Sequence, residues 1–240
     1  MAMARTVNEQ EHARKRNEIL DATMRLILAK GYERMTIQDI IADLGISSGA
    51  FYHYFDSKPA VLDAFIERIR EGWQEPLLPI VRDPHLSAIE KLRGYFATFD
   101  RLRREQRTNV LEVGRVWYRD ENAVVREKVD AAILQQRAPL LAQIVLQGVR
   151  EGVFTTPYPD EAGEVLMALL HGMENTHARL LLSSLDRDRD VPRVIEDVVT
   201  IHAAYMGAIE RVLGAPPNCL YRLDAEAVKV WVTPETEDPV

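Results

Sequence analysis

Seven residues between positions 36 and 58 could hydrogen-bond to phosphate groups or to the polar edges of bases. They are Thr36, Ser47, Ser48, Gly49, Tyr52, His53 and Lys58. Hydroxyl and imidazole groups suit phosphate oxygens, a tyrosine ring can touch a thymine methyl, and a glycine lets the backbone come close. These residue types in one short stretch predict contact with DNA. The competing interpretation is that Tyr52 packs in the core and that Lys58 is simply solvated, while Phe51 and Phe55 are expected in the core.

The same stretch carries the signals of two short helices joined by a tight turn. Thr36 can cap the first helix, with Asp39 as its reciprocal partner. Apolar residues follow with helical spacing, at Ile37, Ile40, Ile41 and Leu44. Gly45 can end this helix in a left-handed conformation, and Ser47 can cap the next one. The pattern predicts a helix-turn-helix, which places a short helix in the DNA major groove.

The run from Gly45 to Lys58 reads Gly-Ile-Ser-Ser-Gly-Ala-Phe-Tyr-His-Tyr-Phe-Asp-Ser-Lys. It resembles the TetR family of transcriptional regulators, and the resemblance extends from about residue 14 to about residue 69. The resemblance implies a helical body that senses small molecules and a dimer in which the last two long helices pair as a four-helix bundle. Ser48 and Ala50 stand where the family commonly has other residues, so the operator sequence cannot be carried over.

The same residues also match a motif of a different class of protein. Gly45, Ser47 and Gly49 match the Gly-x-Ser-x-Gly nucleophile elbow of α/β-hydrolases, but that elbow needs a strand before the serine. Here a capped amphipathic helix precedes it, so a serine nucleophile is not expected. The chain has no phosphate-binding loop, no His-Glu-x-x-His and no Cys-x-x-Cys, and we expect no enzyme activity, no cofactor and no metal.

Composition and charge limit the possible compartments and partners. The 240 residues carry a net charge of −7, yet residues 1–58 hold eight basic and eight acidic residues and are neutral as a segment. No apolar run approaches the roughly 18 residues that a membrane span needs. The polar N-terminus and the single Cys219 favour a cytoplasmic protein without disulfides.

The hydrophobic pattern predicts an all-α protein of two domains with a tail. We expect a DNA-binding domain over 1–72 that includes the start of a fourth helix, an effector-binding and dimerisation domain over 73–214, and a tail of unknown role over 215–240. Helices are expected near 10–30, 86–99, 110–118, 120–150, 160–184 and 192–213, with a proline-rich break at 75–85 and a charged linker at 186–190. In the tail, Val228, Val230 and Val232 alternate with other residues, which favours a lone strand or an extended arm.

Candidate ligand contacts are polar or aromatic residues inside the apolar stripes of the body. His171, Glu174 and Asn175 share one helical face. His171 and Glu174 could ligate a metal, but two ligands make a weak site, and a polar patch at a subunit interface is the preferred interpretation. An aromatic pocket could be lined by Phe96, Phe99, Trp117, Tyr118 and Met167, although core packing explains these residues equally well.

The sequence therefore predicts a homodimer that binds a palindromic site in double-stranded DNA. One short helix reads too few bases, whereas two related by a twofold axis read two half-sites. The expected function is that of a repressor that a small-molecule effector releases from DNA. Binding of the effector in the body is expected to move the fourth helix by way of its residues Leu62 and Phe65. Small residues such as Gly163 and Gly172 are expected at the dimer interface. The alternatives are a helical small-molecule-binding protein or enzyme without a DNA role, and a DNA-binding regulator controlled by a protein partner.

Overall fold

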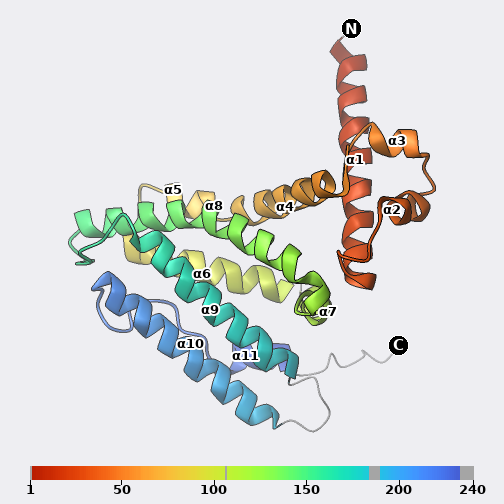
Figure 1. Ribbon diagram of the computed structural model, residues 1–240. Coiled ribbons are helices and arrows are strands. Elements are labelled where there is room, and N and C mark those ends of the chain that lie inside the picture. Colours follow the sequence, from red (N-terminus) through yellow and green to blue (C-terminus); the bar gives the residue numbers. More distant parts are fainter. Residues whose placement is uncertain (1, 106, 184–189, 233–240) are drawn as a thin grey trace, which may run out of the picture. The chain divides into compact units, whose positions relative to one another are not determined.

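The computed structural model describes residues 2–105, 107–183 and 190–232, and within these ranges the chain is helical and contains no strand (Figure 1). The prediction of an all-α fold is confirmed. The chain divides into two compact units. Unit 1 comprises residues 1–72 with 115–133, and unit 2 comprises 73–114 with 134–240. None of the described helices is long and apolar enough to cross a membrane.

Unit 1 is built on a long first helix. Its elements are α1 (Ala2–Lys30), α2 (Ile37–Leu44), α3 (Ser48–Tyr52), α4 (Lys58–Gln74, to Gly72 in this unit), the end of α7 (Arg107–Trp117), the 3₁₀ turn η1 (Asp120–Asn122) and the start of α8 (Ala123–Arg150). Helix α1 begins well before the expected position 10. In Figure 1, α2 and α3 lie beside α1, as the two helices of the predicted motif should.

One apolar core holds unit 1 together. Ile19 and Leu20 of α1, Ile40 of α2, and Leu62 and Phe65 of α4 are almost completely buried in it. Phe51 and Phe55 are 0 % and 5 % exposed, so the prediction that both are core residues is confirmed.

The second segment of unit 1 departs from the sequence-based division, which put residues 115–133 in the body. Val125 and Val129 of α8 are buried in the same core as Leu62 and Phe65 of α4. The hydrophobic effect depends on how much apolar surface is buried and not on where that surface lies in the sequence. One long helix can therefore contribute residues to two cores. Helix α8 supplies residues to unit 1 and, further along, to unit 2.

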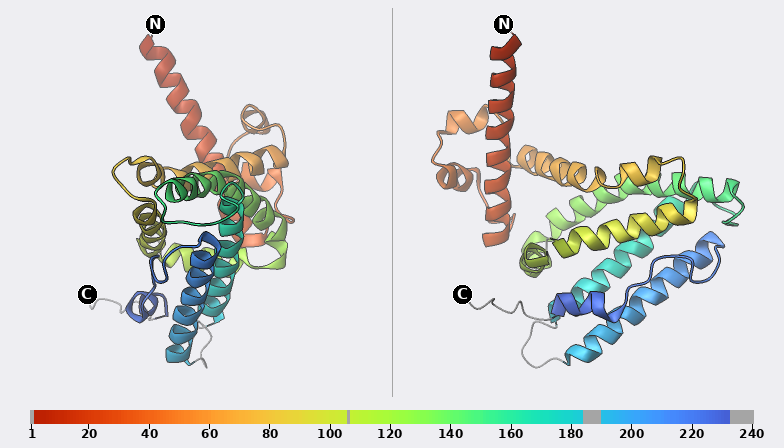
Figure 2. Two further views of the ribbon diagram at one scale, coloured as in Figure 1. Left: turned by 90° about the vertical axis from the view of Figure 1, so that its left-hand side faces the viewer. Right: turned by 180° about the vertical axis from the view of Figure 1, so that it is seen from behind.

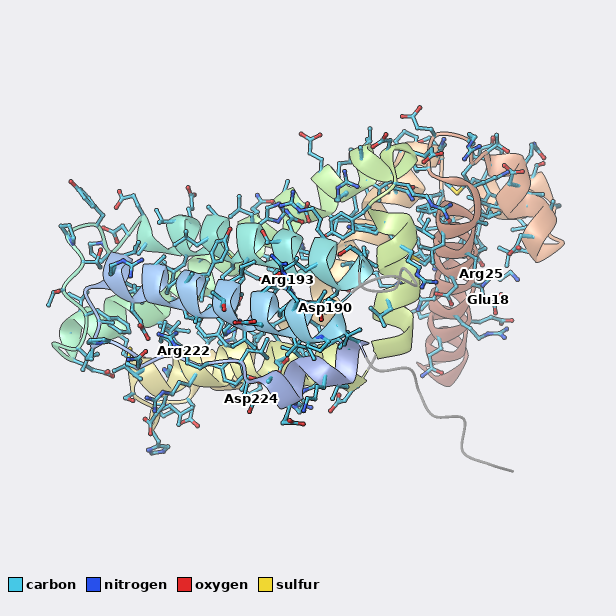
Figure 3. The ribbon with its side chains drawn as sticks, turned by 90° about the horizontal axis from the view of Figure 1, so that it is seen from below. Glu18, Arg25, Asp190, Arg193, Arg222 and Asp224 are labelled. Atoms are coloured by element: carbon cyan, nitrogen blue, oxygen red, sulfur yellow. The ribbon has the colours of Figure 1, made fainter. Side chains whose placement is uncertain are left out.

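The described part of unit 2 is an assembly of helices. Its elements are the remainder of α7 and α8, α5 (Leu78–Arg82), α6 (Ala88–Glu105), α9 (Ala162–Ser183), α10 (Val191–Leu213) and α11 (Ala225–Val232). Helices α9 and α10 run side by side in both views of Figure 2. The short helix α5 lies in the predicted proline-rich break. Of the predicted linker, residues 186–189 lie outside the described residues, and Asp190 caps α10 by accepting the Arg193 N–H at 3.3 Å (Figure 3).

The C-terminal segment folds as a helix where the sequence favoured a strand, so that prediction is wrong. Val228 and Trp231, three positions apart, are 0 % and 7 % exposed, whereas Val230 is 44 % exposed. Val228 packs against Val194 and Val198 of α10. Asp224 caps α11 by accepting the Ala227 N–H at 2.8 Å. The burial period is that of a helix, and the alternating valines are incidental to it.

Candidate functional site

Caps at both ends of α2 and at the start of α3 define the two helices and the turn between them. The Thr36 hydroxyl accepts the Asp39 N–H at 3.2 Å, and the Asp39 carboxylate accepts the Thr36 N–H at 2.7 Å. Gly45 closes α2 with a φ of +62°, a conformation that glycine adopts without strain. Ser47 then accepts the Ala50 N–H at 3.1 Å and starts α3. The local sequence thus sets the angle at which α3 leaves α2.

A salt bridge joins the start of α2 to the end of α1. Lys30 Nζ lies 2.5 Å from the Asp39 carboxylate. Together with the hydrogen bonds from Thr36, Lys30 lowers the pKa of Asp39 to about 2, so this cap stays ionised at any physiological pH. The pair adds a link between the two helices beyond their shared core.

The structure leaves most of the predicted DNA contacts exposed on one short element and the turn before it. Ser47, Ser48, Gly49 and His53 are exposed, and Tyr52 is 48 % exposed although Phe51 beside it is fully buried. An exposed large aromatic side chain next to a buried one shows that α3 presents Tyr52 outward. A tyrosine on such a face offers both a hydroxyl and a ring to a partner.

Thr36 and Lys58 have structural contacts in addition to any role with DNA. The Thr36 hydroxyl belongs to the capping box, so its orientation is already set. Lys58 Nζ donates to the Glu33 carbonyl at 3.2 Å and lies 4.3 Å from the centre of the Tyr32 ring. Both contacts hold the ammonium group against the turn that follows α1.

Sequence reasoning missed His12 of α1, which lies against the end of α3. Its ring centre is 4.7 Å from that of Tyr54 and 5.7 Å from that of His53. Arg16, one turn on, lies over the Phe55 ring at 5.3 Å. No local pattern could have shown these pairs, because about forty residues separate the partners along the chain.

A buried asparagine attaches η1 to the loop after α1. Asn122 is 0 % exposed. Its side-chain oxygen accepts the Tyr32 N–H at 3.1 Å, and its side-chain amide donates to the Val116 carbonyl at 3.0 Å. Arg34 and Glu121 add an exposed ion pair at 3.2 Å. Through Asn122, the loop that leads into α2 and the turn between α7 and α8 form one hydrogen-bonded unit.

Unit 2 contains a cavity of about 80 Å³. Its apolar lining consists of Phe96, Phe99, Met167, Leu170, Met173 and Leu223. Its polar lining consists of Tyr95, Asp100, Arg103, Arg137, Glu174, His177, His202 and Tyr221. Ligand pockets commonly enclose roughly 300–1,000 Å³, so the space here fits a small group or must widen around a larger one.

The charged groups of the cavity are held in place by one another and by an aromatic ring. Arg103 pairs with Glu174 at 2.5 Å. Arg137 is 5 % exposed, and its guanidinium lies 4.1 Å from the centre of the Phe99 ring. Burial pushes the pKa of Glu174 upward, but Arg103 and Arg137 outweigh it and hold that pKa below its usual value. Burial lowers the pKa of Arg137, which its charged and polar neighbours partly offset.

Two histidines stack in the cavity wall. The rings of His177 on α9 and His202 on α10 are 5.8 Å apart and nearly parallel, at 16°. The backbone at Val198 hydrogen-bonds to His177 and the backbone at Tyr221 to His202. The Nε2 atoms of both rings are buried without a hydrogen-bond partner among the described residues. Burial is the main cause that lowers the pKa of His177 to about 4 and also lowers that of His202, so both rings are neutral at pH 7.

The segment after α10 completes the cavity. Tyr221 Oη donates to Asp100 of α6 at 2.8 Å, and burial together with this carboxylate raises the pKa of Tyr221 to about 12. Arg93 of α6 donates to the Cys219 carbonyl at 2.5 Å. Arg222, seen in Figure 3 on the segment between α10 and α11, pairs with Glu210 at 2.7 Å.

Glu210 is the anchor of this segment. It is 5 % exposed, and its two oxygens accept the N–H groups of Asn218 and Leu220, each at 3.0 Å. Burial would raise its pKa, but these two N–H groups and Arg222 outweigh burial and lower it. The sequence did not indicate a role for the tail. In the structure, Tyr221 and Leu223 of the tail line the cavity.

The predicted ligand residues fall in three places. Phe96, Phe99, Met167 and Glu174 line the cavity. Trp117 packs on the core of unit 1, and Tyr118 lies under Arg126 at 5.6 Å. His171 and Asn175 hydrogen-bond to each other at 2.7 Å and are not part of the cavity wall. The described residues hold no group of three or more side chains that could bind a metal ion.

Models of known protein families match a segment in each half of the chain. Residues 19–65 match the family described as bacterial regulatory proteins, tetR family, and residues 109–177 match the tetracyclin repressor-like C-terminal domain. Two TetR-type models thus match separate parts of the chain, and the resemblance to the TetR family read from residues 45–58 is confirmed. These matches support a DNA-binding transcriptional regulator.

Among curated TetR-type relatives, an uncharacterized helix-turn-helix regulator from the lacX 3′ region of Lactococcus lactis is 41 % identical over 63 residues, 26 % of this chain and 32 % of the relative. The repressor KstR2 of Mycobacterium tuberculosis is 24 % identical over 145 residues, 58 % of this chain and 69 % of the relative. Identity is thus higher where the match is confined to a short stretch.

Solved TetR-type structures share the fold at low identity. The structure of a SmeT–triclosan complex aligns with a TM-score of 0.63 at 17 % identity, covering 88 % of this chain and 96 % of that one. The reduced form of Escherichia coli NemR aligns with a TM-score of 0.50 at 19 % identity, covering 85 % of this chain and 98 % of that one. At these identities the likeness establishes the arrangement of helices only.

Proposed function

We propose that the protein is a homodimeric repressor that leaves a palindromic operator when a small molecule enters the cavity of unit 2. The observation that carries the proposal is that one chain holds both an outward-facing α3, with Tyr52 exposed, and a cavity whose polar groups are buried. Curated relatives such as KstR2 are named as repressors, and the SmeT structure is named as a complex with a small molecule.

The DNA contacts are assigned by exposure and chemistry. Ser48 and Tyr52 on α3 meet base edges, while Ser47, His53 and Thr36 meet phosphate oxygens, since hydroxyl and imidazole groups suit these acceptors. Lys58 contributes its charge from the start of α4. Two copies of α3 read half-sites about 34–36 Å apart, the spacing of one helical turn of DNA.

The dimer forms through α9 and α10. Ala168 on α9 and Ala203 and Ala204 on α10 are exposed small residues on the long last helices. Gly172 and Gly163, also expected there, are occupied within the chain: a side chain at Gly172 would press on Tyr205, and one at Gly163 would collide with the backbone of Ala138. The alanines are therefore the better candidates for close approach between protomers.

Helix α8 carries the signal. Its residues Val125 and Val129 belong to the core that also holds Leu62 and Phe65 of α4, and its residue Arg137 lines the cavity. Val129 and Arg137 belong to one continuous helix. A ligand that displaces Arg137 therefore acts on the helix that also contributes to the core around Leu62 and Phe65, and it shifts the protein only as far as it prefers one conformation over another.

Fluorescence anisotropy tests this function. The full chain is titrated onto labelled DNA from upstream of its own gene and onto unrelated DNA, across a series of salt concentrations. The proposal expects saturable binding of one dimer per palindrome that weakens with salt, because phosphate contacts release counterions. Equal and weak binding to both DNAs, with no palindrome protected, would refute the assignment of an operator in that region.

A further inference from the structure

Several buried polar atoms that line the cavity of unit 2 lack a hydrogen-bond partner among the described residues. The residues that line it carry two positive charges, on Arg103 and Arg137, and two negative charges, on Asp100 and Glu174. Asp100 also accepts Tyr221 and pairs with Arg104 at 2.9 Å, and Glu174 pairs with Arg103. A charged ligand would upset this balance, because burying a charge without a partner is costly.

Two of these atoms are histidine nitrogens that can accept a hydrogen bond, and a third is the hydroxyl oxygen of Tyr95. His202 is 6 % exposed, lines the cavity, and has a buried Nε2 without a partner among the described residues, and the stacked His177 shares that feature. The backbone at Tyr221 hydrogen-bonds to His202 and the backbone at Val198 to His177. Since Nε2 of each ring has no partner in the described part of the chain, we assign these backbone hydrogen bonds to Nδ1. A neutral imidazole that donates from Nδ1 presents a lone pair at Nε2. A buried acceptor without a donor costs free energy that a ligand recovers by supplying one.

The remaining walls select an apolar ring. Phe96, Phe99 and Leu223 provide flat or branched apolar surfaces, and Met167 and Met173 provide two flexible thioethers. Thioethers make favourable contacts with aromatic rings and adapt to irregular shapes. The cavity of about 80 Å³ is small, so a single ring fits once these flexible side chains or the segment at Tyr221 yield.

From these features we propose that the effector is a small uncharged phenol whose ring lies among the Phe96, Phe99 and methionine side chains and whose hydroxyl donates to Nε2 of His202, with His177 as the adjoining acceptor. This assignment rests on the proposed function, in which the cavity is the effector site. It names the class of ligand: one aromatic ring, no formal charge, and one hydroxyl donor.

Three matched probes test the assignment by calorimetry on the full chain without DNA. The probes are 4-ethylphenol, its methyl ether 4-ethylanisole, which keeps the ring but has lost the donor, and 4-ethylbenzoate, which carries a charge. The expected result is that the phenol binds at least about tenfold more tightly than the ether, the factor that one hydrogen bond commonly supplies, and that the benzoate binds more weakly than the phenol. Equal binding of phenol and ether, preference for benzoate, or binding of none of the three would overturn the proposal.

Two variants locate the acceptor. His202→Phe removes it, so the phenol should lose its advantage and the ratio of the two dissociation constants should fall to near one. His202→Gln keeps a side-chain oxygen acceptor and should retain part of the ratio, which also covers the case in which the phenylalanine variant does not fold. An unchanged ratio in both variants would exclude His202 as the acceptor.

The same probes distinguish a failure of this inference from a failure of the proposed function. In the anisotropy assay with operator DNA, 4-ethylphenol should release the wild-type protein and should not release His202→Phe at the same concentration. If the phenol binds with the expected preference yet the DNA stays bound, the ligand class stands and its role as effector falls. If another small molecule releases the DNA while the phenol does not bind, the regulator stands and the phenol assignment falls.

Discussion

Helix α3 and the cavity of unit 2 differ in how their polar groups meet water. On α3, Ser48 and His53 are exposed and Tyr52 is half-exposed, so they can be changed without opening a core. In the cavity, His202 and Arg137 are 6 % and 5 % exposed and sit among aromatic rings. This difference predicts that function and stability are separable on the proposed DNA-reading surface and coupled in the proposed ligand cavity. Four substitutions or conditions test this, in order of the expected effect on the free energy of unfolding.

Glu210 should give the largest loss. Glu210→Ala leaves Arg222 and the N–H groups of Asn218 and Leu220 without their acceptor, and breaking a buried ion pair from one side costs about 3–5 kcal/mol. Chemical denaturation monitored by circular dichroism measures the difference. Glu226→Ala is the matched control, because that carboxylate pairs with Lys229 at 2.5 Å but is 78 % exposed, and it should cost at most about 1 kcal/mol. Similar losses for the two variants would contradict the anchoring role of Glu210.

Glu210 also shows why the cavity could not be predicted from the sequence. Its partners lie 8 to 12 positions further on, across a turn that contains Pro216 and Pro217, and their backbone N–H groups leave no mark in the sequence. The cavity draws its walls from α6, α8, α9, α10 and the segment at Tyr221. The helical stripes predicted Phe96, Phe99 and Met167 as inward-facing, but the stacking of His177 on His202 depends on how α9 meets α10.

The DNA-reading half was predictable because its determinants are contiguous. Thr36, Asp39, Gly45 and Ser47 fix two helices and a turn through contacts of three or four positions, which a sequence displays directly. The attachment of residues 115–133 to this half was not predictable. Asn122 follows charged residues and reads as part of an exposed turn, although it is completely buried.

The stacked histidines should make stability fall in mild acid. The folded pKa of His177 is about 4, below its ordinary 6.5, because of burial first and then His202 and Arg103, while Glu174 acts in the opposite direction. A depressed pKa means that the unfolded chain takes up the proton first. The contribution of neutral His177 to the free energy of unfolding is therefore full above about pH 6.5. It is lost progressively as the pH falls toward 4, by roughly 2–3 kcal/mol.

Denaturation at a series of pH values checks this loss against two variants. In His177→Gln the slope between pH 6.5 and pH 4 should become shallower than in the wild type, because a titrating group has gone. His85→Gln, at an exposed histidine, should keep the wild-type slope. If all three proteins showed one slope, the His177 ring would not be a significant source of the acid sensitivity.

Substitution of Asn122 should lower the free energy of unfolding by a smaller amount and should also change DNA binding. In Asn122→Ala the Tyr32 N–H and the Val116 carbonyl lose their buried partner, which costs about 1–3 kcal/mol. The loop before α2 is then less firmly tied to α8, so the operator affinity should change together with the response to effector. Glu121→Ala, one residue away in an exposed ion pair with Arg34, is the control and should cost less than about 1 kcal/mol. An Asn122→Ala protein with wild-type stability would show that this link does not fasten 115–133 to the reader.

Tyr52 should have the smallest effect on folding and a clear effect on function. Its side chain is 48 % exposed, so Tyr52→Ala should change the free energy of unfolding by no more than about 0.5 kcal/mol. A lost contact to a base edge should weaken operator binding by about 1–3 kcal/mol and narrow the gap between operator and unrelated DNA, since phosphate contacts alone do not discriminate sequence. Denaturation and anisotropy on the same preparation separate the two effects. Phe51 is the neighbouring residue and its ring is fully buried, so Phe51→Ala should do the reverse and cost about 3–5 kcal/mol of stability. If Tyr52→Ala instead lowered the free energy of unfolding as much as Phe51→Ala while the folded variant kept the wild-type affinity for the operator, the tyrosine would be a core residue, and the separation of function from stability on α3 would not hold.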